Sequence, residues 1–466
     1  MKDSGVPWLG QVPEHWDIVR NGRLFLQRNE AGHRELPILE VSLKTGVRVR
    51  DFEASPRKQV MSRREKYKVA RAGDITYNTM RMWQGAVGLA PVDGLASPSY
   101  VVAQPLVGTN TSYFERVFRT PSYMSEVNRY SRGIVSDRNR LYWEDFKQIV
   151  SPLPRPAEQA AIVRFLEFVD RRIRRYIAAK RKMIRLLDEK KQVVIGKAAT
   201  RGLDPNVRLK SSGVKWVGDV PDHWGVWKIG HLALVGNGST PSRTNPAYWQ
   251  GGTYPWLNSS CVNLNSITGS EQFVTALALS NCHLPCVQPG SVLVAITGQG
   301  KTRGTAAILL VEATINQHVV YISPSGARIL PEYLHLALTA AYRELRAMSS
   351  DSGSTKGALT CGDIAHFKVP LPPPNEQAQI VSRVTEETGV IDTAIGCLAS
   401  EISLLREYRA RLIADVVTGK LDVREAAARL PDEPAEEEPP DEEDDLGEDE
   451  FDLADDLDAE LQEAEA

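Results

Sequence analysis

The 466-residue chain contains only five cysteines, and their spacing is irregular. A disulfide framework is therefore not expected. No stretch resembles a signal peptide, and no long uncharged apolar run is evident along the chain. These absences predict a protein of the reducing cytoplasm that has no membrane association.

Basic residues are missing from the last part of the chain. Residues 432–466 contain 20 Asp or Glu and no Lys or Arg. The remaining residues 1–431 carry 56 basic against 39 acidic side chains, a net charge of +17. This net positive charge of residues 1–431, which we call the body, predicts a polyanionic partner, with nucleic acid as the leading candidate. The acidic tail is expected to be disordered, as a solvated appendage or as a competitor for a basic surface.

Complete catalytic motifs are also absent. Ala295–Thr302 resembles a phosphate-binding P-loop, but a β-like run follows it where a P-loop needs a helix. Asn245–Tyr248 is the nearest approach to an adenine methyltransferase motif, and no glycine-rich cofactor loop accompanies it. Cys261, Cys282 and Cys286 lack the regular spacing of a metal site. We therefore expect a chain that has no active site and binds no metal or cofactor itself.

The chain does contain a long stretch that occurs twice. Pro152–Asp204 and Pro370–Asp422 both open on a proline-rich run that ends in Glu-Gln, 218 residues apart. Their apolar residues recur with a period of about 3.5, which predicts two long helices that pair with each other, antiparallel. The seam residues are Ile173, Ile177, Ile184, Leu187 and Val194, matched by Ile391, Ile395, Ile402, Leu405 and Leu412. Lys180 and Lys191 interrupt this seam in the first copy.

A shorter segment, which we call the clasp, is also duplicated. Residues 4–16 match residues 212–224, and both copies end in Val-Pro-acid-His-Trp. Its Gly and Pro residues predict turns, and its Trp residues predict anchors that dock a loop on a core. A structural role is favoured over a ligand site. A catalytic role for His15 or His223 is not expected, because no acidic or nucleophilic partner is fixed near either one in the sequence.

Each clasp is followed by a region of short β-branched runs and one expected helix, at 113–129 and at 331–348. The sequences of these two regions are largely dissimilar. We therefore expect a duplicated frame, made of the clasp and the long helix, that holds two unlike domains. The fold class predicted is α+β, with two mixed α/β domains separated by two antiparallel coiled-coil helices in a pseudo-twofold repeat. The predicted boundaries are 1–150 and 211–368 for the domains, 151–210 and 369–424 for the helices, and 425–466 for the tail.

Both domains have loops rich in side chains that suit DNA. Arg pairs well with guanine, and Asn or Gln with adenine, through two hydrogen bonds each. The candidates in the first domain are Tyr77, Asn78, Arg81, Trp83, Gln84, Ser99, Tyr100, Arg132, Ser136, Arg138, Asn139 and Arg140. Those in the second are Ser239, Thr240, Ser242, Arg243, Asn258, Ser259, Gln299, Lys301, Arg303, Ser354, Thr355 and Lys356. For any one of them, a phosphate contact or an ordinary surface role remains the simpler alternative.

The doubled order of clasp, domain and Glu-Gln helix resembles the specificity subunit of a Type I restriction–modification system, over about residues 3–422. The resemblance implies that each domain is a target-recognition domain reading one half of an interrupted, asymmetric double-stranded DNA site. It implies that the helices set the spacing and dock two modification subunits, which use S-adenosylmethionine to methylate adenine. Restriction subunits, using ATP and Mg, would add translocation and cleavage. The acidic tail departs from the family pattern.

The length of the helices fits the role of a spacer. A helix of about 43 residues spans roughly 64 Å, or about one to two turns of DNA. The alternative function is a coiled-coil scaffold with two protein-binding domains and no DNA specificity. It would explain the frame but not the basic body, and it predicts no salt-sensitive DNA binding.

Overall fold

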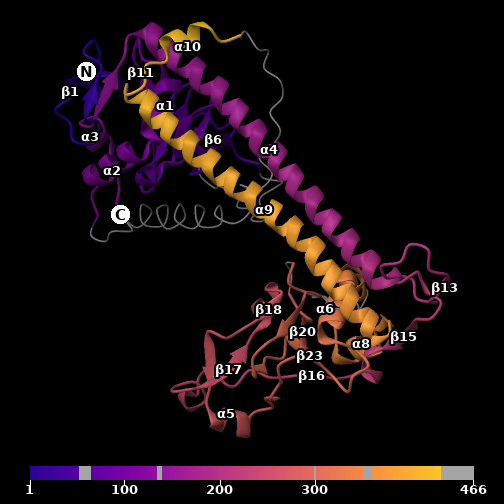
Figure 1. Cartoon of the computed structure of the whole chain (residues 1–466). Coiled ribbons are helices and arrows are strands. Elements are labelled where there is room, and N and C mark those ends of the chain that lie inside the picture. The colour runs from indigo at the N-terminus through magenta and orange to yellow at the C-terminus, as the bar shows by residue number, and fades with distance from the viewer. Residues whose placement is uncertain (52–63, 134–138, 299–300, 351–357, 432–466) are drawn as a thin grey trace. The chain divides into compact units, whose positions relative to one another are not determined.

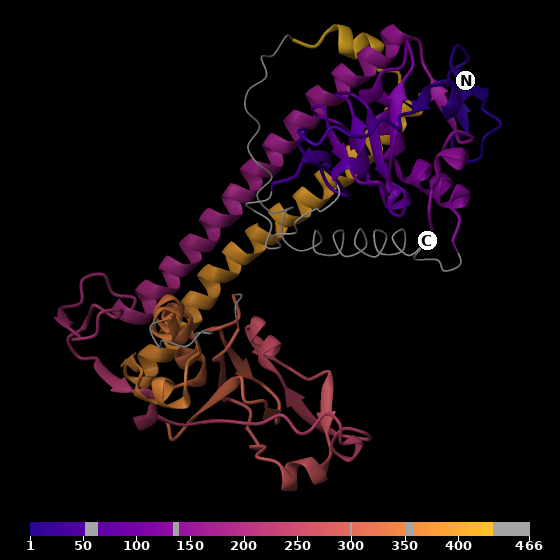
Figure 2. The same ribbon diagram turned by 180° about the vertical axis from the view of Figure 1, so that it is seen from behind.

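The computed structural model describes residues 1–51, 64–133, 139–298, 301–350 and 358–431. The chain forms two compact units: unit 1 contains residues 1–181 and the chain from 399 onward, and unit 2 contains residues 182–398. Two long helices, α4 (Pro156–Arg201) and α9 (Pro374–Val417), each begin in one unit and end in the other (Figures 1 and 2). The α+β fold class with paired long helices is confirmed.

Ion pairs between α4 and α9 define an antiparallel pairing. In unit 1, Asp170 pairs with Arg409, and Lys180 pairs with Glu401. In unit 2, Lys191 Nζ lies 2.6 Å from an oxygen of Asp392. The two lysines that interrupt the seam thus each reach a carboxylate of the other helix, while their stems cover apolar surface.

The predicted seam residues all lie at least half-buried. The buried members are Ile173, Ile177, Ile391, Ile402 and Leu412, and the half-buried members are Ile184, Leu187, Val194, Ile395 and Leu405. Their partial burial is typical of a two-helix pair, because two helices alone cannot enclose an apolar stripe completely.

Unit 1 is built on a four-stranded antiparallel sheet. Its strands, in spatial order, are β4 (Phe25–Gln27), β11 (Tyr100–Pro105), β8 (Ile75–Asn78) and β9 (Val87–Leu89). Helices α1 (Thr111–Phe118) and α2 (Pro121–Tyr130) contribute aromatic side chains to the core beside it. Phe25, Phe114 and Phe118 are fully buried in that core.

Unit 2 contains a sheet with the same strand order. It consists of β16 (Ala233–Asn237), β23 (Val319–Pro324), β20 (Val292–Ala295) and β21 (Ala306–Leu309), with β18 (Ser266–Ile267) added in parallel at the edge. The expectation that only the frame is duplicated is therefore wrong. A buried strand requires apolar side chains of suitable volume rather than particular residues, so the fold persists where sequence similarity collapses.

Shorter strands complete each unit. In unit 1, β1 (Lys2–Asp3) pairs with β2 (Gln11–Val12), β3 (Asp17–Arg20) with β12 (Val150–Leu153), β5 (Leu39–Ser42) with β6 (Gly46–Val49), and β7 (Lys68–Ala70) with β10 (Gly94–Ala96). In unit 2, β13 (Leu209–Ser211) pairs with β14 (Asp219–Pro221), β15 (Gly225–Lys228) with β24 (Lys368–Leu371), and β17 (Tyr254–Leu257) with β19 (Gln272–Val274) and β22 (Thr314–Ile315). The strand after each clasp therefore pairs with the strand before each long helix.

The single helix expected in each domain is in fact two helices. In unit 1, Thr120 caps α2 by accepting a 3.4 Å hydrogen bond from Tyr123 N, and Pro121 occupies its first turn. In unit 2, Ala341 caps the end of α6 (Pro331–Ala340), and α7 (Tyr342–Ser350) follows. The short helices are α3 (Trp143–Phe146), α5 (Ala276–Asn281), α8 (Cys361–His366) and α10 (Arg424–Ala428).

Each clasp is fixed to the start of a long helix. His15 Nε2 lies 2.8 Å from Glu158 Oε2, and His223 Nε2 lies 2.9 Å from Glu376 Oε2. Both histidines thus have an acidic partner, contrary to the sequence-based expectation, because Glu158 and Glu376 are distant in sequence. Trp224 Nε1 also donates to Glu376, at 3.1 Å.

The same clasps cover the far ends of the long helices. Gly419 follows α9 with φ +77°, and a Cβ there would lie 2.3 Å from Pro13 Cδ and 3.0 Å from the ring of Trp16. Gly202 follows α4 with φ +71°, and a Cβ there would lie 3.1 Å from the ring of Trp224. Glycine is required at both turns, since its backbone enters the left-handed region without strain and leaves room for the tryptophan.

One described helix, α9, is long and apolar enough to cross a membrane by length and composition, with an 18-residue window of mean hydropathy 1.4. This is weak evidence for a membrane span, although it departs from the expectation of no long apolar run. Ile391, Ile402 and Leu412 of the same helix lie in the seam and are 6–8% exposed. Helix pairing accounts for these apolar residues.

We predict that Gly419→Ala destabilises unit 1 more than Gly108→Ala. Both glycines have a positive φ, +77° and +84°, but only Gly419 has a neighbour within 4 Å of the added Cβ. The left-handed backbone should cost each variant ~1–2 kcal/mol, and the clash with Pro13 should add ~1–3 kcal/mol for Gly419→Ala. Urea denaturation of the two variants measures the difference. Equal losses of unfolding free energy in the two variants would contradict the close packing of Gly419 against Pro13.

Candidate nucleic-acid interface

Hydrogen bonds gather the candidate loops of unit 1 around Thr79, just after strand β8. Thr79 Oγ1 donates to the carbonyl of Ser99 at 2.9 Å, and its own carbonyl accepts from Leu141 N at 2.8 Å. Three segments distant in sequence, 78–84, 97–100 and 139–141, therefore meet at one end of the sheet. The sequence predicted each segment as a candidate, but not that they meet.

Three of the unit 1 candidates are buried. Tyr77 is fully buried with its ring centroid 5.1 Å from that of Phe146, and Tyr100 is 3% exposed in a neighbouring core. The expected surface contact is wrong for these two residues, because β8 and β11 are central strands. Asn78 is 2% exposed, and its Oδ1 accepts a 2.9 Å hydrogen bond from Met80 N, which shapes the loop.

The other unit 1 candidates lie nearer the surface. Gln84 is exposed, and Arg81, Trp83 and Ser99 are half-buried. Trp83 Nε1 donates to Met80 O at 2.9 Å. These side chains hold the loop after β8 in shape and leave its end, at Gln84, available to a ligand.

Two described residues after α2, Arg132 and Arg140, pair through their backbones. Arg132 and Arg140 exchange two backbone hydrogen bonds, at 3.0 and 2.9 Å. The exposed Arg132 also donates to Asp145 at 2.5 Å, and Asn139 donates to Asn128 at 2.9 Å. Arg132, Asn139 and Arg140 are thus held beside the loop after β8. Ser136 and Arg138 lie outside the described residues.

Arg243, a unit 2 candidate, is stacked against two indole rings. Its guanidinium carbon lies 3.8 Å from the ring centroid of Trp249 and 4.9 Å from that of Trp256. The two indoles meet edge-to-face with centroids 5.3 Å apart, and Arg243 Nη2 donates to Gln272 Oε1 at 2.8 Å. An exposed arginine that stacks and keeps further donors is pre-organised to bind a phosphate or a base edge.

The remaining described candidates of unit 2 surround the ends of strands β16, β17 and β20. Thr240 Oγ1 donates to Gln317 Oε1 at 2.7 Å, and Asn258 Oδ1 accepts from Ser260 N at 3.0 Å. Ser242 and Lys301 are exposed, whereas Ser239, Ser259 and Arg303 are half-buried. Gln299, Ser354, Thr355 and Lys356 lie outside the described residues.

Sequence reasoning missed a polar group that precedes β23. Gln317 Nε2 lies 3.2 Å from His318 Nε2, and Thr297 Oγ1 lies 2.9 Å from His318 Nδ1. This group precedes β23 as Ser97–Ser99 precedes β11, the corresponding strand of unit 1. The shared strand order was the signal that could have found it.

The described side chains of the two loop clusters have chemistry suited to binding. They offer guanidinium, amide, hydroxyl and imidazole groups at the surface. Among residues 1–51, 64–133, 139–298, 301–350 and 358–431, no three His, Cys, Asp or Glu side chains are placed to hold a metal ion. The P-loop-like segment leads from strand β20 toward strand β21, and the described part of it forms no helix.

Comparison with known proteins gives a consistent result. The family model of the Type I restriction modification DNA specificity domain matches residues 221–389. The Type I restriction enzyme EcoR124I/EcoR124II specificity subunit of Escherichia coli is 22% identical over 38% of this chain and 44% of its own length. The match therefore spans less than half of that relative. The putative type I restriction enzyme MjaX specificity subunit of Methanocaldococcus jannaschii is 19% identical over 89% of this chain and 96% of its own length.

A solved structure resembles the whole frame. Its chain comes from work on the complex assembly and conformational transition of the type I R-M system, and aligns with a TM-score of 0.66 at 17% identity. The alignment covers 88% of this chain and 100% of the other. At this identity the likeness establishes the fold.

Proposed function

Because this chain belongs to the family of Type I restriction–modification specificity subunits, we propose that it selects the DNA site of such a complex. Each unit reads one half of a bipartite, asymmetric double-stranded site. One observation carries the proposal: the same sheet occurs twice and carries unlike polar loops at the same end. A repeated scaffold with different loops is suited to two different half-sites.

The charge of the body supports DNA as the ligand. Residues 1–431 have a net charge of +17, which favours a polyanion. Arg243 on its two indoles and Gln84 at the end of the loop after β8 are the side chains we assign to base or phosphate contacts. Tyr77 and Tyr100 are left out of this assignment because they are buried.

The long helices set the spacing of the half-sites in this proposal. Helix α4 has 46 residues and α9 has 44, and each is about 65–70 Å long at about 1.5 Å per residue. Their outer faces also carry unusually exposed apolar side chains. Tyr176, Leu404 and Tyr408 of unit 1 are 52%, 63% and 55% exposed, and Val193 and Val390 of unit 2 are 67% and 71% exposed. Such faces are suited to docking two modification subunits.

The chemistry then belongs to the partners. The modification subunits supply S-adenosylmethionine and methylate adenine, and restriction subunits supply ATP-driven translocation and cleavage with Mg. This chain contributes binding and geometry, in the cytoplasm where the genome lies.

Salt-dependent DNA binding tests the proposal as a whole. The chain assembled with its modification subunits should bind its methylated motif at least ~10³-fold more tightly than random duplex at moderate salt. Its affinity should fall steeply as salt rises, because counterions are released from the DNA. Fluorescence anisotropy measures both quantities. Binding that is insensitive to salt and sequence would favour the protein-binding scaffold instead.

We predict that four extra residues in both helices lengthen the spacer of the recognised site. The insertion is placed between Lys180 and Lys191 in α4 and between Asp392 and Glu401 in α9, so that the flanking ion pairs are kept. It adds about 6 Å, close to two base pairs at about 3.4 Å each. Methylome sequencing should show the same two half-sites, one or two base pairs further apart. The same insertion in the exposed loop after Pro205 is the control, and an unchanged spacer in the helix variant would refute the spacing role.

We predict that Arg243→Gln alters one half-site only. Losing one good arginine contact should cost ~1–3 kcal/mol at one base position, which methylome sequencing detects as relaxed sequence preference there. Arg243→Lys, which keeps the charge but loses the planar fork, should relax the same position. Arg132→Gln in unit 1 is the matched control, since any change should fall in the other half-site. A change of both half-sites by Arg243→Gln would contradict modular reading.

A further inference from the structure

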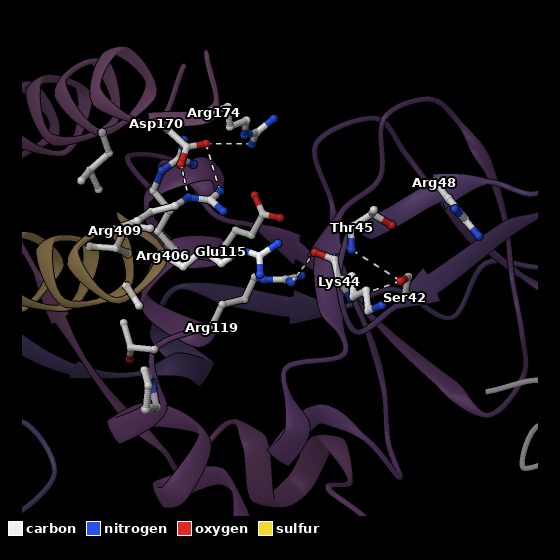
Figure 3. A pocket seen from close by; sticks show the side chains of 16 residues that line it. Ser42, Lys44, Thr45, Arg48, Glu115, Arg119, Asp170, Arg174, Arg406 and Arg409 are labelled. Atoms are coloured by element: carbon white, nitrogen blue, oxygen red, sulfur yellow. Dashed lines mark hydrogen bonds and ion pairs between the residues drawn. The ribbon is translucent and has the colours of Figure 1, made fainter. Parts of the chain in front are cut away.

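A basic cavity of about 680 Å³ lies in unit 1 apart from the loop cluster (Figure 3). The β5–β6 hairpin, helix α1, and the paired segments of α4 and α9 that belong to unit 1 provide its walls. Of its 16 lining residues, seven are Lys or Arg and two are Asp or Glu. The lining therefore has a formal charge of +5.

The two carboxylates do not neutralise this cavity. Asp170 is shared between Arg409 and Arg174, with Arg174 Nη2 at 2.7 Å. Burial raises the pKa of Glu115 above its ordinary value, which disfavours its charged form. Outside the lining, Glu40 pairs with Arg48, and Glu167 pairs with Arg116. Seven cations against these four carboxylates still leave an excess of positive charge around the cavity, which favours an anion.

One arginine is part of the wall rather than of a binding group. Arg119 donates to the carbonyls of Val87 and Leu43 at 3.0 and 2.7 Å. Arg406 and Lys44 are exposed on opposite walls, on α9 and on the β5–β6 turn. These two side chains can meet a ligand that enters from solvent.

The lining also restricts the kind of anion. It contains no aromatic side chain, so a nucleobase would find no ring on which to stack. Arginine forks and a lysine are suited to phosphate oxygens and carry no base preference. The chemistry is that of a phosphate site which is indifferent to sequence.

The position of the cavity relates it to the loop cluster of the same unit. Val87, whose carbonyl binds Arg119, is the first residue of β9, and β9 follows directly on the loop that ends in Gln84 and Gly85. A ligand held in the cavity is thus adjacent to the strand that positions this loop.

Unit 2 lacks the matching charges. At the 218-residue offset, Asp170 and Arg174 of α4 correspond to Thr388 and Asp392, and Arg406 and Arg409 of α9 correspond to Asp188 and Lys191. The charge of these four positions changes from +2 to −1. The cavity is therefore a feature of unit 1 and not a consequence of the repeated frame.

We propose that this cavity binds backbone phosphate of the DNA beside the half-site read by unit 1. The inference rests on the proposed function and deepens it. Unit 1 gains affinity from a phosphate contact that unit 2 does not have in the corresponding place. This contact fixes the DNA against the helices and contributes nothing to the choice of bases.

The test uses the full chain assembled with its modification subunits. The variant Lys44→Gln with Arg406→Gln removes two exposed cations and leaves Arg119, Asp170 and Arg409 in place. We expect its affinity for the specific duplex to fall about 5- to 20-fold at moderate salt, and the slope of log affinity against log salt to shrink by about 1–2. The methylated motif should stay the same, because phosphate contacts carry no sequence information.

Two further variants sharpen the result. Arg411→Gln removes one cation from the helix that carries Arg406, at a side chain that is 82% exposed and outside the lining, and should change affinity less than twofold. Lys44→Arg with Arg406→Lys keeps both charges and should restore the salt slope.

Each outcome is decisive. A double variant that binds with the wild-type affinity and salt slope, or that methylates an altered motif, would overturn the phosphate site while leaving the proposed function intact. If the wild-type complex shows no salt-dependent, sequence-specific DNA binding, both the phosphate site and the proposed function are refuted. Thermal denaturation of each variant checks that the fold is unchanged.

Discussion

The ends of the two long helices impose the constraint on which the rest of the structure depends. The last carbonyls of a helix have no partner within it and need one elsewhere when they are buried. Tyr113 Oη donates to the carbonyl of Val417 at 2.9 Å, and Tyr333 Oη donates to that of Ala199 at 3.0 Å. The end of α9 is thereby satisfied by the domain of unit 1, and the end of α4 by the domain of unit 2.

The beginnings of the same helices are fixed by one glutamine in each helix. Gln159 accepts from Asn110 N at 2.9 Å and donates to Pro154 O at 2.8 Å, while Gln377 accepts from Leu330 N and donates to Pro372 O, both at 2.8 Å. Asn110 and Leu330 are the capping residues of α1 and α6. Each Glu-Gln pair therefore binds the clasp through the glutamate and the domain through the glutamine. The polar loops are free of this framework, so they can differ between the units without loss of the fold.

The sequence predicted the frame well because the frame is built from repeated, periodic and local signals. The 3.5-residue period of the seam and the two Glu-Gln openings are visible without any structure. The shared sheet was missed because buried strands such as β8 and β20 need only apolar bulk. The histidine partners Glu158 and Glu376 were missed because they lie more than 140 residues from the clasps they bind.

The candidate site was harder to predict for a different physical reason. A tyrosine in a β-branched run, such as Tyr77 or Tyr100, has the same local sequence signal whether it faces a core or solvent. Whether the tyrosine is buried depends on whether its strand is central in the sheet, and that position is a property of the fold. Gln317 and His318 were not predicted as candidates, because a short polar turn can be recognised as part of the site only from its position before β23.

Under the proposed function, the difference between the two units bears on how two half-site specificities can evolve on one frame. Contacts that maintain the frame, such as those of Tyr113 and Tyr333, occur in both units and cannot change without loss of stability. Charges on the long helices, such as Arg406 and its counterpart Asp188, are not needed for the fold and can differ. In the proposed function, affinity can therefore be placed on the helices of one unit while sequence reading stays in the loops of both. A loop that changes its preferred base would then keep the proposed phosphate contact beside it.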